Sequence, residues 1–253
     1  MTTQSSHQHL MDRLVQLRLP AFRQALETQL ATPQYDELSF EERLSLLVEA
    51  EVLQRQDNRI QRRVRLAHFQ QTAWVQEIDY LPGRGLQRQQ ILQLAQTTWI
   101  RKGLNLIILG PTGAGKTYIA CALGRVACEQ DLVTRYFRLS RFFQEMKIAQ
   151  LDGTYHQLIR SLRKTDLLIL DDWLRDTLSL IESQYLLDIL DDRYNRMATM
   201  LVSQFPISAW HTRFPDPTLA DAILDRLVHN AHRIELQGES QRKIRALHTM
   251  SST

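Results

Sequence analysis

The sequence predicts an α/β fold, in which a parallel β-sheet is flanked by helices and preceded by a small all-helical domain. From residue 104 onward, short apolar strands alternate with amphipathic helices, which is typical of a parallel sheet with helices on both faces. Upstream of residue 80, the spacing of apolar residues is helical throughout. The Pro-Gly-Arg-Gly run at 82–85 separates these two patterns, because it interrupts regular structure.

Length and composition limit the possible classes of protein. The 253 residues are enough for one α/β domain and a smaller helical one, which we place at 104–253 and 1–80, with a linker and short helix at 81–103. With 43% apolar and 23% charged residues, the chain has the profile of a globular protein. No segment approaches the roughly 18 consecutive apolar residues of a membrane span, and the polar N-terminus lacks a signal peptide's apolar core. We therefore expect a cytoplasmic protein with no membrane partner.

The N-terminal domain is expected to consist of long helices. Leu10, Leu14 and Leu17 fit one amphipathic helix, which either ends near Pro20 or resumes after it. A second helix begins at the capping box formed by Ser39 and Glu42 and continues to residue 65.

This second helix carries a stripe of arginines that has two interpretations. It can be an ordinary solvated face, or it can contact the phosphate backbone of DNA. Only Asp57 interrupts the stripe, so we expect that internal salt bridges cannot neutralise it. The candidate DNA-binding residues are Arg55, Arg59, Arg62, Arg63 and Arg65.

The α/β domain is expected to alternate regularly between strands and helices. A short helix over 86–99 comes first. The predicted strands lie at 105–109, 133–139, 167–170 and 200–202, and the predicted helices lie at 116–129, 140–151 and 179–195.

A complete phosphate-binding loop follows the first of these strands. Its sequence has the spacing G-x-x-x-x-G-K-[ST], between an apolar strand and an amphipathic helix. Glycines let backbone N–H groups turn toward phosphate oxygens, and the start of the helix adds partial positive charge. Lys116 is expected to reach the β- and γ-phosphates of ATP, and the Thr117 hydroxyl is expected to bind Mg²⁺. The expected nucleotide-binding residues are Gly110, Pro111, Thr112, Gly113, Ala114, Gly115, Lys116, Thr117 and Tyr118.

Two carboxylates end the apolar strand at 167–170. Burying two acids at this position would be costly without a cation. We expect Asp171 to hold Mg²⁺ through water, together with Thr117, and Asp172 to orient and activate the attacking water.

From residue 110 onward the chain resembles the AAA+ ATPases, and among them the IstB-like transposition helper proteins of the clade that includes replication initiators and the helicase loader DnaC. The resemblance covers nearly the whole chain, including the N-terminal stretch at 38–44. It is carried by the phosphate-binding loop, by Leu-Ile-Leu-Asp-Asp-Trp at 168–173 and by Val-Ser-Gln-Phe-Pro at 202–206. The most specific segments are Asp-Pro-Thr-Leu-Ala-Asp-Ala-Ile-Leu-Asp-Arg-Leu at 216–227, His-Asn-Ala-His-Arg-Ile at 229–234 and Gly-Glu-Ser at 238–240.

The resemblance implies roles that spacing alone does not assign. Gln204 occupies the place of the sensor 1 polar residue near the γ-phosphate, and Arg242 is similar to a sensor 2 arginine. Arg226 looks like an arginine finger that acts on the neighbouring subunit's nucleotide, although from the residues alone it could be a helix-surface arginine. Two positions depart from the wider pattern: Asp172 replaces the glutamate of most AAA+ proteins, and Val202 stands where relatives often have threonine.

The function implied by the resemblance is ATP-dependent assistance of DNA transposition. In this hypothesis, ATP and Mg²⁺ drive self-association into a homo-oligomer on double-stranded DNA. The oligomer then recruits an IstA-type transposase, and ATP hydrolysis controls the assembly. A helicase loader similar to DnaC is the alternative, since it shares the ATPase core and differs in the partner of residues 1–80. A metabolic P-loop kinase has less support, because the sequence shows no second substrate pocket or lid motif.

Overall fold

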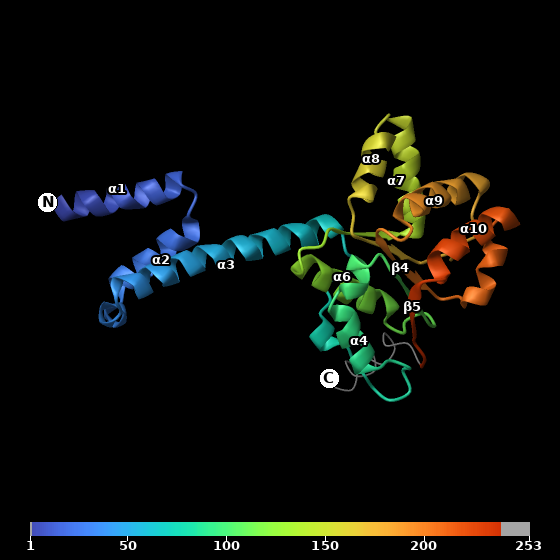
Figure 1. Ribbon diagram of the computed structural model, residues 1–253, viewed down its shortest axis with the longest axis horizontal. Coiled ribbons are helices and arrows are strands. Elements are labelled where there is room, and N and C mark those ends of the chain that lie inside the picture. Colours follow the sequence, from blue (N-terminus) through green and yellow to red (C-terminus); the bar gives the residue numbers. More distant parts are fainter. Residues whose placement is uncertain (1, 239–253) are drawn as a thin grey trace, which may run out of the picture. The chain divides into compact units, whose positions relative to one another are not determined.

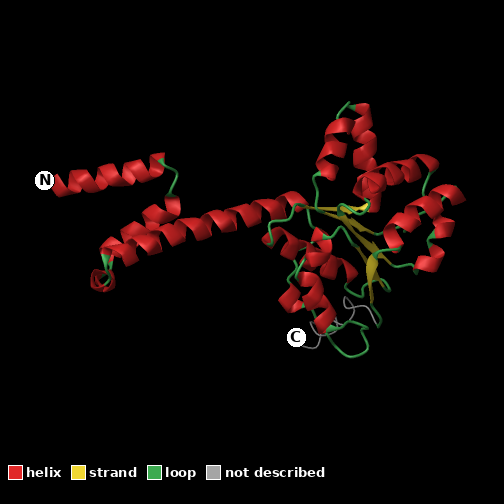
Figure 2. Cartoon of the chain, viewed as in Figure 1, coloured by secondary structure: helices red, strands yellow, loops and turns green. Residues whose placement is uncertain are grey.

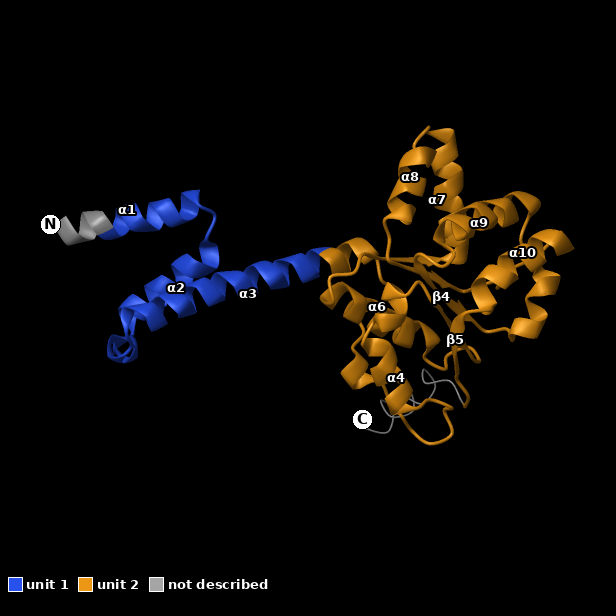
Figure 3. Ribbon diagram, viewed as in Figure 1, with its two compact units in different colours: residues 1–62 blue, residues 63–253 orange. Residues whose placement is uncertain are grey.

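The computed structural model of the protein describes residues 2–238. The chain divides into two compact units, residues 1–62 and residues 63–253 (Figure 3). The division falls inside the long helix α3 (Phe40–Ala67). Within residues 2–238, every helix is too short or too polar to span a membrane.

The first unit is all-helical, as predicted. Its elements are α1 (Thr2–Gln16), α2 (Pro20–Ala31), the 3₁₀ turn η1 (Pro33–Glu37) and the first part of α3. One helix ends before Pro20 and the next begins there, because proline fits the first turn of a helix but not its interior. The predicted capping box opens α3: the Ser39 N–H donates to the Glu42 carboxylate at 2.8 Å, and the Glu42 N–H donates to the Ser39 hydroxyl at 3.3 Å.

Glu51 joins α2 to α3 within this unit. Its buried carboxylate accepts hydrogen bonds from the backbone N–H groups of Ala21 (3.0 Å) and Phe22 (3.1 Å) and from the Arg55 side chain (2.8 Å). Burial alone would raise the pKa of Glu51, but these donors outweigh it and leave the pKa below its usual value. A negative charge at the start of α2 also stabilises that helix.

The segment between the arginine stripe and the first strand belongs to the second unit, although the sequence predicted a boundary near residue 80 and a linker over 81–103. It contains the 3₁₀ turn η2 (Val75–Glu77) and helices α4 (Arg88–Ala95) and α5 (Thr98–Arg101). Its apolar side chains are part of the hydrophobic core that covers one face of the sheet, which is why it does not behave as a free linker. The buried apolar residues are Ala67, Ala73, Val75, Ile78, Leu86, Ile91, Leu94, Trp99 and Ile100.

The second unit is built on a five-stranded parallel sheet, so the predicted fold class is confirmed. The strands are β1 (Asn105–Leu109), β2 (Thr134–Arg138), β3 (Leu167–Asp171), β4 (Ala198–Ser203) and β5 (Ala231–Glu235), in the spatial order β2-β3-β4-β1-β5. All neighbouring pairs are parallel. The carboxyl ends of β1, β4 and β3 therefore lie side by side, which is where ligands bind in open α/β sheets.

Alternate residues of each strand enter two different cores. On β1, Leu106 and Ile108 pack beneath α4, α5 and α6, whereas Ile107 and Leu109 pack beneath the helices of the opposite face. Figures 1 and 2 show the strands between these two helical layers. The remaining helices are α6 (Lys116–Glu129), α7 (Leu139–Leu151), α8 (Tyr155–Arg163), α9 (Leu180–Arg193) and α10 (Pro217–Val228).

Three elements of the second unit were not among those expected from periodicity: α8, α10 and β5. The edge strand β5 reads Ala-His-Arg-Ile-Glu, and only Ile234 in it is buried, so its pattern lacks the apolar run of an inner strand. Helix α10 begins at Pro217, where the Asp216 carboxylate caps it by accepting a bond from the Leu219 N–H at 2.9 Å. Two 3₁₀ turns, η3 (Ile207–Ala209) and η4 (His211–Arg213), connect β4 to α10.

Candidate functional site

The phosphate-binding loop connects the carboxyl end of β1 to the first residue of α6. Gly110, Gly113 and Gly115 have φ values of 145°, 84° and 94°, which side chains rarely allow. A Cβ on Gly110 would lie 2.6 Å from the Leu236 carbonyl oxygen, and one on Gly115 would lie 3.0 Å from Arg84 Nη2. The glycines are thus required both by backbone conformation and by the close packing around the loop.

Lys116 and Thr117 begin the first turn of α6. Lys116 contacts the phosphate-binding loop, and Thr117 contacts the carboxylate at the end of β3. Lys116 Nζ donates to the Pro111 carbonyl oxygen at 2.9 Å, so the ammonium group lies over the loop. Thr117 Oγ1 donates to Asp171 Oδ2 at 2.7 Å. The hydroxyl and the carboxylate predicted to share a metal ion are therefore in direct contact.

Asp171 ends β3 and is held by three donors. Thr117 and Tyr136 both donate their hydroxyl protons to Oδ2 at 2.7 Å, and the Asp172 N–H donates to Oδ1 at 2.7 Å. Asp171 and Tyr136 are both buried. Burial and the nearby Asp171 charge raise the pKa of the Tyr136 phenol far above its ordinary value, so the hydroxyl stays protonated and remains a donor.

Asp172 lies beside Asp171 but in different surroundings. Its backbone is left-handed, with φ of 55°, and its side chain is 41% exposed. Arg138 Nε and Arg175 Nη1 lie 3.9 and 3.7 Å from Asp172 Oδ2. The second carboxylate is consequently open to solvent, as a group that contacts a water molecule must be.

Gln204 follows β4, between the ends of β1 and β3. Its Oε1 accepts a hydrogen bond from the Thr112 hydroxyl at 2.8 Å, which attaches it directly to the phosphate-binding loop. The neighbouring Ser203 is fully buried and bonds to the Trp173 carbonyl oxygen at 3.0 Å, so it points away from the loop. The structure therefore brings Lys116, Thr117, Asp171, Asp172 and Gln204 to the same edge of the sheet.

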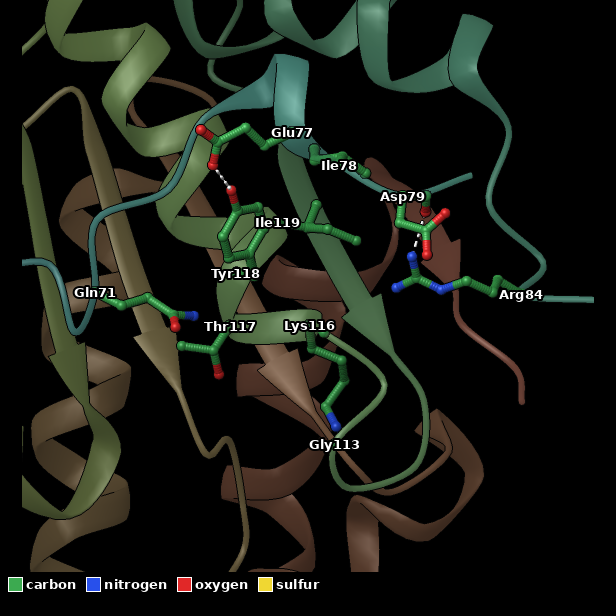
Figure 4. A pocket seen from close by; sticks show the side chains of 11 residues that line it. Gln71, Glu77, Ile78, Asp79, Arg84, Gly113, Lys116, Thr117, Tyr118 and Ile119 are labelled. Atoms are coloured by element: carbon green, nitrogen blue, oxygen red, sulfur yellow. Dashed lines mark hydrogen bonds between the residues drawn. The ribbon is translucent and has the colours of Figure 1, made fainter. Parts of the chain in front are cut away.

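A pocket lies beside the loop, between the start of α6 and the segment at 71–84 (Figure 4). Glu77 Oε2 accepts a bond from the Tyr118 hydroxyl at 2.8 Å, and that hydroxyl accepts the Trp74 N–H at 3.3 Å. On the other side, the buried Arg84 donates to the Ala114 carbonyl oxygen at 2.8 Å and to the Asp79 carbonyl oxygen. The apolar side chains of Ile78 and Ile119 complete the lining.

These residues fit a nucleoside triphosphate and a magnesium ion. The glycine loop leads into the start of α6, where backbone N–H groups can face phosphate oxygens, and Lys116 supplies a positive charge beside it. The hydroxyl of Thr117 and the carboxylates of Asp171 and Asp172 are the oxygen donors that Mg²⁺ prefers. The adjoining pocket, with apolar walls and polar ends, suits a purine base.

Of the two other predicted nucleotide contacts, only Arg226 lies among the described residues. Arg226, on α10, forms an ion pair with Asp191 of α9 and donates to the Ala222 carbonyl oxygen at 2.6 Å. These contacts hold the Arg226 side chain against α9 and α10 of its own subunit, away from the residues of the phosphate-binding loop. Arg242 lies outside the described residues.

The arginine stripe on α3 is less free than the sequence indicated. The prediction that internal salt bridges cannot neutralise it is wrong for two members. Arg55 binds Glu51 one turn earlier and the Arg18 carbonyl oxygen at 3.0 Å, and Arg63 pairs with Asp131. The acid at 51 was overlooked because it precedes the stripe, and Asp131 is 68 residues away in sequence. Arg62 and Arg65 are exposed, and Arg59 has a partner of its own.

Sequence reasoning missed Tyr136, Arg84 and Glu77. Tyr136 faces Asp171 because β2 pairs with β3 in a register that cannot be predicted from the sequence alone. A hydroxyl inside a buried strand was the one available signal, since buried phenols need a partner. Arg84 and Glu77 lie in segments that were interpreted as linker and helical domain.

The chain is similar to known ATP-binding proteins of insertion sequences. A sequence model of the family described as "IstB-like ATP binding protein" matches residues 12–249. The chain is 43% identical over 233 residues to the "Putative insertion sequence ATP-binding protein y4pL" of Sinorhizobium fredii, which covers 92% of this chain and 95% of that one. It is also similar to the solved structures of the DnaC helicase loader (TM-score 0.51, 18% identity, covering 59% of this chain and 88% of that one) and of DnaI (TM-score 0.57, 22% identity, covering 65% and 91%). At these identities, the likeness to the two structures concerns the fold.

Proposed function

This chain belongs to the IstB-like ATP binding proteins and is an AAA+ ATPase, and from this premise we propose that it is an ATP-dependent helper of DNA transposition. Bound ATP brings subunits together on double-stranded DNA in the cytoplasm. The assembly recruits the transposase of the same mobile element, and ATP hydrolysis controls the lifetime of the assembly. One combined observation supports the proposal most strongly. The phosphate-binding loop, the two strand-end aspartates and Gln204 meet at the same edge of the sheet, and the chain is closely similar to an insertion-sequence protein.

The roles of the site residues follow from their contacts. The N–H groups of the loop and Lys116 bind the triphosphate, while Thr117 and Asp171 hold Mg²⁺. When bound, Mg²⁺ neutralises charge on the phosphate oxygens. Asp172, exposed and beside Asp171, accepts a proton from the attacking water and orients it. Gln204, which Thr112 fixes beside the loop, would position the same water.

The arginine finger is proposed to act between subunits. In the isolated chain, Arg226 is paired with Asp191, and its side chain is 29% exposed. Ion pairs at the surface contribute only about 0–1 kcal/mol, and this pair is partly exposed, so a neighbouring triphosphate can replace Asp191 as its partner. This arrangement makes hydrolysis depend on assembly.

Helicase loading is the rival function, and it shares every feature of the ATPase core. The likeness to the DnaC helicase loader is at 18% identity, whereas the similarity to the insertion-sequence protein is at 43% and spans nearly the whole chain. The balance of similarity therefore favours transposition.

An Asp172→Asn protein tests whether hydrolysis controls the assembly. We expect it to bind ATP and assemble on duplex DNA like the wild type, but to hydrolyse ATP about 10²- to 10⁴-fold more slowly, because the proton acceptor is lost. Mass photometry with ATP, Mg²⁺ and a 30-base-pair duplex would then detect complexes that persist, while wild-type complexes decay. ADP in place of ATP is the control. Unimpaired turnover would place the base elsewhere, and absence of any nucleotide-dependent complex in the wild type would contradict the proposed function.

A Tyr136→Phe protein tests the hydrogen bond to the proposed metal-holding carboxylate. Losing an outer hydrogen bond of this kind typically weakens metal binding or activity about 10- to 100-fold. We expect weaker Mg²⁺-dependent binding of a fluorescent ATP analogue, with unchanged binding in EDTA. Tyr155→Phe is the matched control, since it also removes a phenol hydroxyl but lies in the opposite core, near Tyr185. Equal magnesium dependence in both variants would show that Tyr136 only fills space.

A further inference from the structure

Two polar hollows lie beside the segment at 64–73, one against strand β2 and the other against helix α6. Because β2 is the first strand in the sheet order, no strand of residues 2–238 covers its outer edge. The two adjoining hollows share His68 and Gln70 in their linings and together form what we call the β2 trough. Its arginine lining consists of Arg65, Arg125, Arg135, Arg138 and Arg141.

The charge of this trough is strongly asymmetric. Among the described residues that line it, Glu145 is the single acid, although the whole chain holds 28 acids against 31 Lys and Arg. Within residues 2–238, Arg65 and Arg141 form no side-chain hydrogen bond or ion pair, and both are exposed. Arg138 is half-exposed, with only the distant contact to Asp172 at 3.9 Å. Arg125 is paired with Glu129 at 3.0 Å, but the remaining guanidinium groups repel one another, so the trough favours an anionic ligand.

The arrangement of the lining indicates which anion. Arg135 and Arg138 lie on β2, Arg141 lies in the first turn of α7, and Arg65 lines the adjoining hollow. Tyr136 and Phe137 of the lining are buried, whereas Val64 and Phe69 are half-buried. The solvent-facing lining is therefore mainly basic and polar, which suits a phosphate chain better than the apolar centre of a protein interface.

We propose that the β2 trough binds the phosphate backbone of nucleic acid. This inference rests on the proposed function, in which the protein assembles on DNA, and it assigns the contact to the ATPase unit. The proposal also narrows the set of arginines on α3 that are expected to contact DNA. Arg55 and Arg63 are engaged in bonds within the protein, whereas Arg65 lines the trough. The contacts are to phosphate, so they carry no sequence preference.

A double variant, Arg65→Gln with Arg141→Gln, tests the trough. Each lost phosphate contact lowers the slope of log affinity against log salt by about one, so the slope should fall by about two and the affinity by about tenfold at low salt. Fluorescence anisotropy of a labelled 30-base-pair duplex over a salt series, with ATP and Mg²⁺, measures both. The matched control is Arg88→Gln with Arg160→Gln, which removes the same charge from exposed positions outside the trough. Thermal melting verifies that both proteins are folded.

The possible outcomes distinguish a failure of the proposed trough contact from a failure of the proposed function on which it rests. If the wild type does not bind the duplex at any salt concentration, the proposed function itself is contradicted. If it binds without salt dependence, the phosphate contacts of the trough are overturned while the function stands. If the wild type binds and both double variants bind equally tightly, the trough is overturned while the function stands. A competing explanation holds that the arginines only prevent the open edge of β2 from pairing with other chains. It predicts that the Arg65 and Arg141 variant aggregates while its soluble fraction binds DNA as tightly as the wild type, which would also overturn the proposal.

Discussion

The Lys116→Ala protein is expected to lose measurable ATP binding, and with it every ATP-driven assembly. Lys116 places a positive charge over the loop, and its ammonium group already bonds to the loop at Pro111. A charge-assisted hydrogen bond contributes about 1.5–3 kcal/mol, which is about 10- to 200-fold in affinity. The backbone N–H groups that remain would leave only weak binding.

Equilibrium binding of a fluorescent ATP analogue, with Mg²⁺ present, measures this loss. Lys102→Ala is the matched control, because it removes a lysine that precedes β1 and lies outside the pocket lining. Both proteins should have similar melting temperatures without nucleotide, and only the control should be stabilised by ATP. Binding of wild-type strength by Lys116→Ala would show that the triphosphate is held elsewhere.

The Arg226→Ala protein is expected to bind ATP normally and to hydrolyse it about 10³- to 10⁵-fold more slowly, which is the contribution of an arginine finger supplied in trans. The reason is geometric. Arg226 lies on α10, where its partners are Asp191 and the Ala222 carbonyl oxygen, so its effect on the nucleotide should come through a neighbouring subunit.

Mixing variants distinguishes this role from a structural one. Arg226→Ala retains a working loop, and Lys116→Ala retains the finger, so an equimolar mixture should recover part of the ATPase activity that neither has alone. Asp191→Asn is the control for the ion pair, because it releases Arg226 without removing it. Full turnover by Arg226→Ala, or a mixture as inactive as its components, would contradict action in trans.

The features that the sequence predicted well are local in the chain. The phosphate-binding loop, the strand before it and the helix after it occupy one continuous stretch, and β1 and α6 have the predicted bounds. The capping box at Ser39 is equally local, since two side chains three residues apart form it. Patterns of this kind need no knowledge of which segments meet in the folded protein.

The features that the sequence did not predict depend on contacts between distant segments. The wall of the pocket comes from residues 71–84, whose place beside α6 follows from packing of residues such as Val75 and Ile78 on the sheet. The contact of Tyr136 with Asp171 depends on strand register, and the pairing of Arg63 with Asp131 spans two elements. The short edge strand β5 lacked an apolar pattern because it is only half covered.

The measurement that tests the account most directly is a calorimetric titration of the wild-type protein with ATP in the presence of Mg²⁺. A site built from the loop at 110–117 and from Asp171 predicts saturable binding of one ATP per chain, weakened when EDTA removes the metal. If the folded protein took up no ATP with magnesium present, assembly and DNA handling would have no source of nucleotide control, and the account would be contradicted at its base.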